Sequence, residues 1–199
     1  MLLPTLIFSA LFFLMGLISL LDVKPPLADN WLINSVLLTL NMFLVGIYEE
    51  GCFRACACDA LLPAFRKTRH PFILTAVISS VIFGYVHVVS ADFSDLQQVL
   101  QFFLKIANVS VTGITYMILY WKTRNLSGLA IVHALNDLLP LIMYETFNWG
   151  IAETESYTSG ESSTTVIYLI QLVFNIICLI YVYRKVGKTI DYKKTLEEW

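Results

Sequence analysis

Residues 41–62, NMFLVGIYEEGCFRACACDALL, decide how this chain is interpreted. The stretch is almost wholly apolar, yet it contains two adjacent carboxylates, Glu49 and Glu50, and it places Arg54 four residues after the second. An ionisable side chain at membrane depth is costly, so such groups usually face a polar cavity and mark a functional site. The stretch therefore predicts a membrane helix that carries part of such a site.

The composition of the whole chain agrees with a membrane protein. Its 199 residues are 57% hydrophobic and 14% charged, with a mean hydropathy of +0.70. These values are typical of proteins that cross the bilayer several times, so we expect the lipid bilayer as a partner. The net charge is −2, and the absence of a long basic run argues against a nucleic-acid partner.

Six segments have the roughly 20 mostly apolar residues that a membrane-spanning helix needs. They are Leu2–Leu21, Trp31–Arg54, Phe72–Val89, Leu96–Trp121, Leu126–Tyr144 and Thr165–Tyr183. We expect the second to continue as a helix through Ala55–Phe65. The predicted fold class is all-α: a polytopic membrane protein, a helical bundle of about six transmembrane helices that forms a single domain over residues 1–199.

The charges of the connecting loops orient these segments. Cations gather in residues 66–69, in residues 122–124 and after residue 183, whereas the alternate loops, including the outer loop 153–165, are acidic. Basic loops stay on the cytoplasmic side of a membrane. The alternation therefore predicts that both termini are cytoplasmic.

Few other strongly polar side chains lie inside the predicted spans. His87 ends the run FGYVH, and the run HALND at 133–137 brings a second histidine. Glu50 and His87 lie at similar distances along the chain from the turn RKTRH. If both flanking segments are helical, each residue lies roughly 24–26 Å from this turn, and the two are at the same depth. Residues four apart share a helix face. Three pairs have this spacing: Glu50 with Arg54, Phe83 with His87, and His133 with Asp137.

Three motifs together resemble the CAAX-protease and bacteriocin-processing family (CPBP, or Abi) of intramembrane proteases. They are E-E-x-x-x-R at 49–54, F-x-x-x-H at 83–87 and H-x-x-x-[N/D] at 133–137. Each is short, but their order on near-successive membrane helices is specific, and the resemblance covers about residues 43–143. Ala55 stands where many relatives have Gly. The third motif ends in Asp137, preceded by Asn136, so either residue can face the site.

The resemblance implies an intramembrane endopeptidase that needs neither metal nor cofactor. Glu49 would be the base that activates water, and Glu50 with Arg54 would fix its position, although helix phase alone leaves open which glutamate is the base. His87 would orient or deprotonate the water. His133, with Asp137 or Asn136, would bind the carbonyl oxygen of the substrate. Phe83 would give structural support.

The resemblance also implies a peptide or protein substrate in or at the membrane. A small bacterial member, in the cytoplasmic membrane, is expected to act on leader peptides, peptide pheromones or bacteriocin precursors. Two alternatives stay open. Two histidines and a glutamate are a known catalytic zinc set, although the spacing H-E-x-x-H is absent. The same charges can also form a buried network in a bacteriocin-immunity or membrane interaction protein without proteolytic activity.

Overall fold

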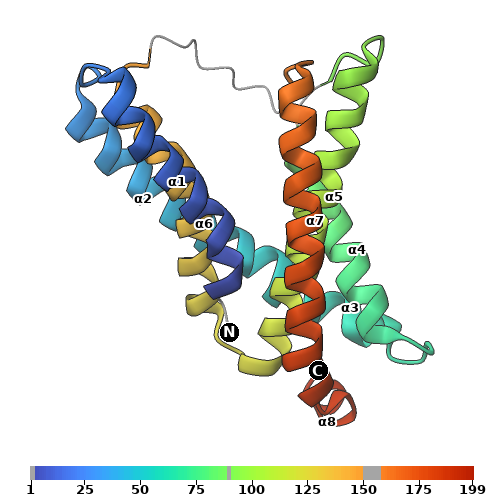
Figure 1. Ribbon diagram of the computed structural model, residues 1–199. Coiled ribbons are helices and arrows are strands. Elements are labelled where there is room, and N and C mark those ends of the chain that lie inside the picture. The colour runs from blue at the N-terminus through green and yellow to red at the C-terminus, as the bar shows by residue number, and fades with distance from the viewer. Residues whose placement is uncertain (1–2, 89–90, 150–157) are drawn as a thin grey trace. The chain divides into compact units, whose positions relative to one another are not determined.

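The computed structural model describes residues 3–88, 91–149 and 158–199, and these residues fold into helices (Figure 1). The helices are α1 (Leu3–Val23), α2 (Trp31–Glu50), a π-helix (Gly51–Cys56), α3 (Ala57–Phe65), α4 (Pro71–Val86), α5 (Leu96–Thr123), α6 (Leu126–Thr146), α7 (Ser162–Lys185), a 3-10 turn (Gly187–Thr189) and α8 (Tyr192–Glu197). This confirms the all-α fold class. Leu2, Val89 and residues 153–157 of the predicted outer loop lie outside the described residues.

Within the described residues, five helical runs are long and apolar enough to cross a membrane. One of them is the 35-residue run Trp31–Phe65, which confirms the expected continuation of the second segment. The remaining predicted span, Phe72–Val89, corresponds to α4, which has only 16 residues. Such a helix is about 24 Å long, shorter than the roughly 30 Å of a hydrocarbon core. The protein is therefore a polytopic membrane protein whose fourth helix is short.

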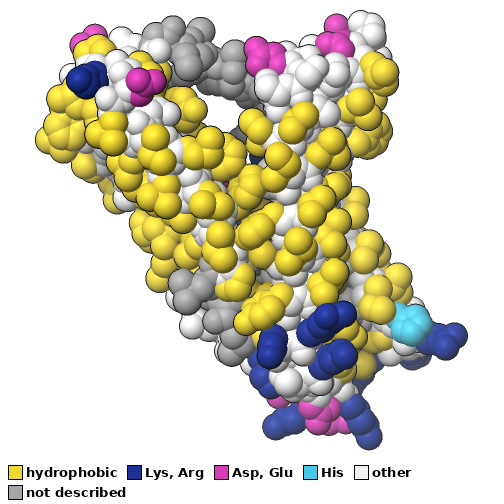
Figure 2. Space-filling model, in the orientation of Figure 1, with side chains coloured by type: hydrophobic (Ala, Val, Ile, Leu, Met, Phe, Trp, Pro, Cys, Tyr) yellow, Lys and Arg dark blue, Asp and Glu magenta, His cyan; other side chains and the backbone are white. Residues whose placement is uncertain are grey.

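The outward faces of the long helices are apolar. Ile18 of α1, Leu44 of α2 and Val173 of α7 are 67%, 66% and 60% exposed. Figure 2 shows such side chains covering wide areas of the surface. A large contiguous apolar surface is rare on soluble monomers and is typical of helices that face lipid.

The helices gather into two compact units, residues 1–50 with 126–153, and residues 51–125 with 154–199. In the first unit, α6 packs against both α1 and α2. The loop between α1 and α2 is tied to the end of α6, because Ala28 N–H donates to the Thr146 carbonyl (3.1 Å) and Asn148 N–H to the Pro26 carbonyl (2.9 Å). The single domain expected from the sequence stays a prediction.

The second unit is organised around α5, which packs against α4 and α7. The contact with α4 is close: a Cβ added at Gly113 would lie 2.9 Å from Ser80 Oγ. The contact with α7 is polar, because the Asn108 amide donates to the Tyr168 carbonyl (2.9 Å) and accepts from Asn175 (3.0 Å). Small residues and side-chain amides are the usual means by which membrane helices associate.

Candidate active site

Glu49 and Glu50 are the last two residues of α2, and their surroundings differ. The Glu50 side chain is fully buried, whereas that of Glu49 is 19% exposed. Both glutamates belong to the first unit, in which α2 packs against α6, the helix that carries His133. The two adjacent carboxylates therefore differ in their access to water.

Three carboxylates surround the His133 ring. Its Nδ1 lies 2.8 Å from Glu50 Oε1, and its Nε2 lies 3.3 Å from both Glu49 Oε2 and Asp137 Oδ2. The ring is buried, with only 8% of the side chain exposed, whereas Asp137 is 40% exposed. We call these four side chains, Glu49, Glu50, His133 and Asp137, the carboxylate cluster. The structure thus brings together four of the five predicted catalytic residues.

Gly46 permits the close helix approach that builds this cluster. A Cβ at Gly46 would lie 2.5 Å from the Ala130 carbonyl oxygen, so only glycine fits the observed crossing of α2 and α6. One helical turn after this crossing, α2 presents Glu50 and α6 presents His133. Gly46 is a site residue that was not predicted from the sequence. The pattern that could have indicated it is a small residue on a membrane helix, one turn before a charged residue.

Asn136 and Asp137 have different neighbours. Asp137 lies beside His133, as described above. Ser9 of α1 donates to the Asn136 carbonyl oxygen (3.0 Å) and contacts its side-chain oxygen (3.1 Å). The contacts of Asn136 therefore join α6 to α1, and Asp137 is the residue of this pair that belongs to the carboxylate cluster.

The second unit holds Arg54, which lies in the π-helix directly after the glutamates in sequence. Its side chain is fully buried. The guanidinium carbon lies 4.7 Å from the centre of the Phe83 ring and 5.7 Å from that of Tyr116. Short π-helical segments are rare and occur often at functional sites.

His87 caps the C-terminal end of α4 in the same unit. Its Nδ1 lies 2.7 Å from the Phe83 carbonyl oxygen, and its ring packs edge-on against the Phe83 ring with centroids 4.5 Å apart. Because a carbonyl only accepts hydrogen bonds, Nδ1 is the donor, and in the neutral ring Nε2 then carries the lone pair. We call Arg54, Phe83 and His87 the arginine–aromatic cluster. The predicted pairing of Glu50 with Arg54, and the meeting of the two clusters in one site, stay predictions.

Among the described residues, no group of three or more His, Cys, Asp or Glu side chains is arranged to hold a metal ion. Both ring nitrogens of His133 already lie against carboxylate oxygens. No disulfide joins the four cysteines, all of which lie in the described part of the chain.

Comparison with known proteins identifies the family. The model of the Rce1-like family, described as type II CAAX prenyl endopeptidase Rce1-like, matches residues 30–139, which is more than half of the chain. The match includes all three sequence motifs. The comparisons with curated proteins and with solved structures gave no match. The chain belongs to the Rce1-like family of type II CAAX prenyl endopeptidases and is a membrane protease of the CAAX type.

Proposed function

We propose that the enzyme hydrolyses peptide bonds with a water molecule that Glu49 activates. The observation that carries this assignment is the contrast between the two glutamates. Glu50 is fully buried and bonded to His133, whereas Glu49 is partly exposed. A general base has to come within hydrogen-bond distance of the water whose proton it accepts. Glu49 is therefore the base, and Glu50 holds His133 in position.

His133 is proposed to bind the carbonyl oxygen of the scissile peptide bond. A ring that carries hydrogen on both nitrogens donates from Nδ1 to Glu50 and presents Nε2–H where Glu49 and Asp137 each lie 3.3 Å away. In the reaction, water attacks the carbonyl carbon, Glu49 accepts its proton, and the oxygen that becomes negative is stabilised by Nε2–H. Glu49 then passes the proton to the leaving amine as the C–N bond breaks.

The arginine–aromatic cluster is proposed to complete this site. His87 would contact the attacking water through Nε2, the nitrogen that the bond to Phe83 leaves as an acceptor. Arg54 would stabilise the negative charge of the glutamates that precede it in sequence. The support for joining the clusters is the order of the three motifs and the family membership of the chain.

The proposed substrates are small membrane-associated peptides of the leader or bacteriocin-precursor type. The family name adds prenylated proteins with a C-terminal CAAX sequence as a second class to test. The proposed location is a bacterial cytoplasmic membrane, with both termini on the cytoplasmic side. The support for this orientation is the alternation of basic and acidic loops.

A peptide-release assay in membranes tests the proposal. Wild type is compared with Glu49→Gln, His87→Ala and His133→Ala, at matched expression. We expect loss of product in all three variants and no inhibition by chelators. Inhibition that added zinc reverses would instead support zinc hydrolysis. Protection against a bacteriocin that survives loss of both Glu49 and His87 would assign both clusters a structural role in an immunity protein.

A further inference from the structure

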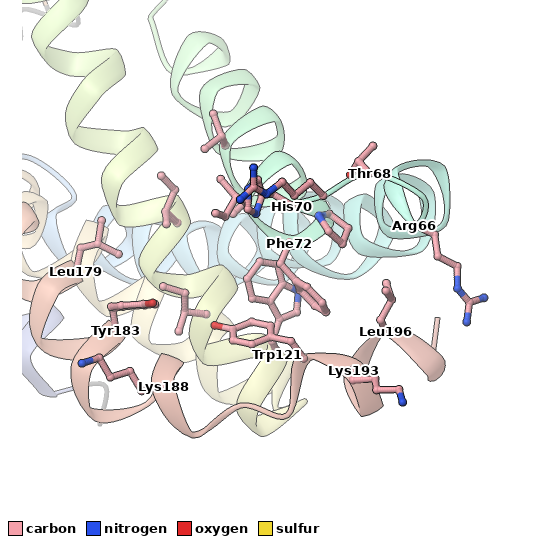
Figure 3. Close-up of a pocket in the computed structure, with 18 of the residues that line it drawn as sticks. Arg66, Thr68, His70, Phe72, Trp121, Leu179, Tyr183, Lys188, Lys193 and Leu196 are labelled. Atoms are coloured by element: carbon pink, nitrogen blue, oxygen red, sulfur yellow. The ribbon is translucent and has the colours of Figure 1, made fainter.

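A separate pocket lies at the basic end of the second unit. It has a volume of about 880 Å³ and is formed by the α3–α4 loop, α4, α5, the end of α7, and α8 (Figure 3). Figure 3 shows Phe72 and Trp121 in the middle of the lining, with Tyr183 and Lys188 to one side and Arg66 to the other. The two clusters described above contribute none of the described lining residues.

The charge of this pocket has one sign. Its described lining includes five Lys or Arg residues and His70, and no Asp or Glu. The cations are Arg66, Arg69, Arg184, Lys188 and Lys193, all of them exposed. Figure 2 shows Lys and Arg side chains gathered at this end, next to a broad apolar surface. Such an arrangement attracts an anion at the boundary between water and lipid.

The wall of the pocket away from these cations is apolar and lies on the outer surface of the helices. Ile73 and Val77 of α4 are 60% and 43% exposed, and Ile180 of α7 is 46% exposed. In a protein that spans the membrane, these surfaces face hydrocarbon. An occupant that satisfies both parts of the pocket therefore needs an anionic head and an apolar chain, whereas an acidic water-soluble peptide would leave the apolar wall unfilled.

Aromatic rings between the two parts fix the shape of the pocket. The Phe72 ring packs against Trp121 and Tyr192, with centroids 4.9 and 4.8 Å away. A tyrosine hydroxyl is a neutral donor at physiological pH, and burial raises the pKa of Tyr192 further. Trp and Tyr are common at the level of lipid headgroups. The rings therefore place the pocket at that level.

We propose that this pocket binds an anionic phospholipid, with its phosphate among the cations and one acyl chain along the apolar wall of α4 and α7. The bound lipid would hold α8 and the α3–α4 loop against the ends of α5 and α7. This inference does not depend on which residue performs catalysis, because the pocket and the two clusters share no residue.

Three neighbouring pairs of cations give a matched test. Arg66, Arg184 and Lys193 line the pocket, whereas Lys67, Lys185 and Lys194, each the next residue in the chain, are outside its described lining. Replacing either set with Gln removes the same charge from the same end of the protein. If the lipid is held only by general attraction to the surface, its binding should weaken equally in both triple variants. If it is held in this pocket, its binding should weaken only in the first.

Trp121 reports on the occupant. The full-length protein, with Trp31, Trp149 and Trp199 replaced by Phe, is placed in phosphatidylcholine vesicles that contain brominated phosphatidylglycerol or brominated phosphatidylcholine. We expect stronger quenching of Trp121 by the anionic lipid. In the lining variant, which has Gln at positions 66, 184 and 193, this preference falls by about fivefold for each lost cation, which corresponds to about 1 kcal/mol per Lys or Arg. The neighbouring variant, which has Gln at positions 67, 185 and 194, keeps the preference.

Native mass spectrometry provides a second readout that needs no tryptophan replacement. Wild type and the neighbouring triple variant should retain phosphatidylglycerol through purification, and the lining variant should lose it. Equal quenching by the two lipids, or an equal loss in both triple variants, would overturn the proposal. Displacement of the lipid by a soluble acidic peptide, without any lipid preference, would overturn it in favour of a peptide site. Circular dichroism checks that each variant keeps its helices.

Discussion

The carboxylate cluster and the arginine–aromatic cluster hold buried charge in different ways. In the first unit, ionisable side chains contact one another, and Glu49 and Asp137 keep partial exposure. In the second unit, the fully buried Arg54 lies against the rings of Phe83 and Tyr116. Hydrogen-bonded groups with access to water can exchange protons, whereas a guanidinium packed against rings is a fixed charge. The carboxylate cluster is therefore suited to proton transfer, and the arginine–aromatic cluster is suited to a structural role as a fixed charge.

Apart from the two glutamates, removal of His133 is expected to lower the rate of peptide release the most. His133→Ala deletes the ring that three carboxylates share, together with the proposed donor to the carbonyl oxygen. We expect peptide release to fall by about 10²–10³-fold, the usual cost of one oxyanion donor. The measurement is the initial rate of product formation in membranes. A rate within a few-fold of wild type would show that the ring only fills space.

A methyl group at Gly46 should separate α2 from α6. Gly46→Ala places its Cβ against the Ala130 carbonyl oxygen, a backbone atom that cannot turn aside. We expect a stability loss of about 1–3 kcal/mol, as for an overpacked core, together with reduced activity. Thermal unfolding in detergent measures the first effect, and peptide release measures the second.

Gly51→Ala is the matched control for this substitution. Among the described residues, no atom lies within 4 Å of a Cβ added at Gly51, apart from the neighbouring backbone. The Gly51 variant should therefore unfold at the wild-type temperature. Equal destabilisation by the two substitutions would contradict the role assigned to the Gly46 crossing.

The ring contacts of Arg54 should contribute less. Arg54→Lys keeps the charge but loses the flat guanidinium that stacks on Phe83, so we expect a stability loss of about 0.5–2 kcal/mol. Phe83→Leu removes the other member of the pair. The double variant should lose less stability than the sum of the losses in the two single variants, and a double-mutant cycle measures this difference. Additive losses would mean that the two side chains act independently.

The smallest effect is expected at Asn136. Asn136→Ala removes one side-chain contact with Ser9 and should cost about 0.5–1.5 kcal/mol of stability with little loss of activity. Asp137→Asn should lower the activity with little loss of stability, because Asp137 lies beside His133 Nε2. Rates and unfolding temperatures of the two variants separate these effects. A greater loss of activity at Asn136 would contradict the assignment of Asp137 to the cluster.

Much of the fold follows from hydropathy, because lipid contact demands long apolar helices whatever their partners are. The rarity of charge inside those helices also singled out Glu49, Glu50, Arg54 and His87. The short length of α4 was less predictable. Its apolar run was extended to Val89, but His87 already caps the helix after Val86. Hydropathy reports where apolar residues end, and not where the backbone leaves the helix.

The partners within the site were harder to predict than its members. The sequence spacing paired Glu50 with Arg54, but it could not show that Glu50 bonds to His133, 83 residues away. That contact depends on the crossing of α2 and α6 at Gly46, which is a property of packing. The π-helix at Gly51–Cys56 was also unpredictable, because one widened turn leaves the apolar pattern almost unchanged.

We propose different roles for the two adjacent glutamates, with Glu49 as the base and Glu50 as a positioning residue. The decisive measurement is the peptide-release rate of Glu49→Gln and of Glu50→Gln in the same membranes, each with its unfolding temperature. We predict that Glu49→Gln loses about 10²–10⁴-fold in rate at unchanged stability. Glu50→Gln should lower both the rate and the unfolding temperature, because the buried bond to His133 weakens. A Glu49→Gln enzyme that cleaves its substrate at the normal rate would show that Glu49 is not the base.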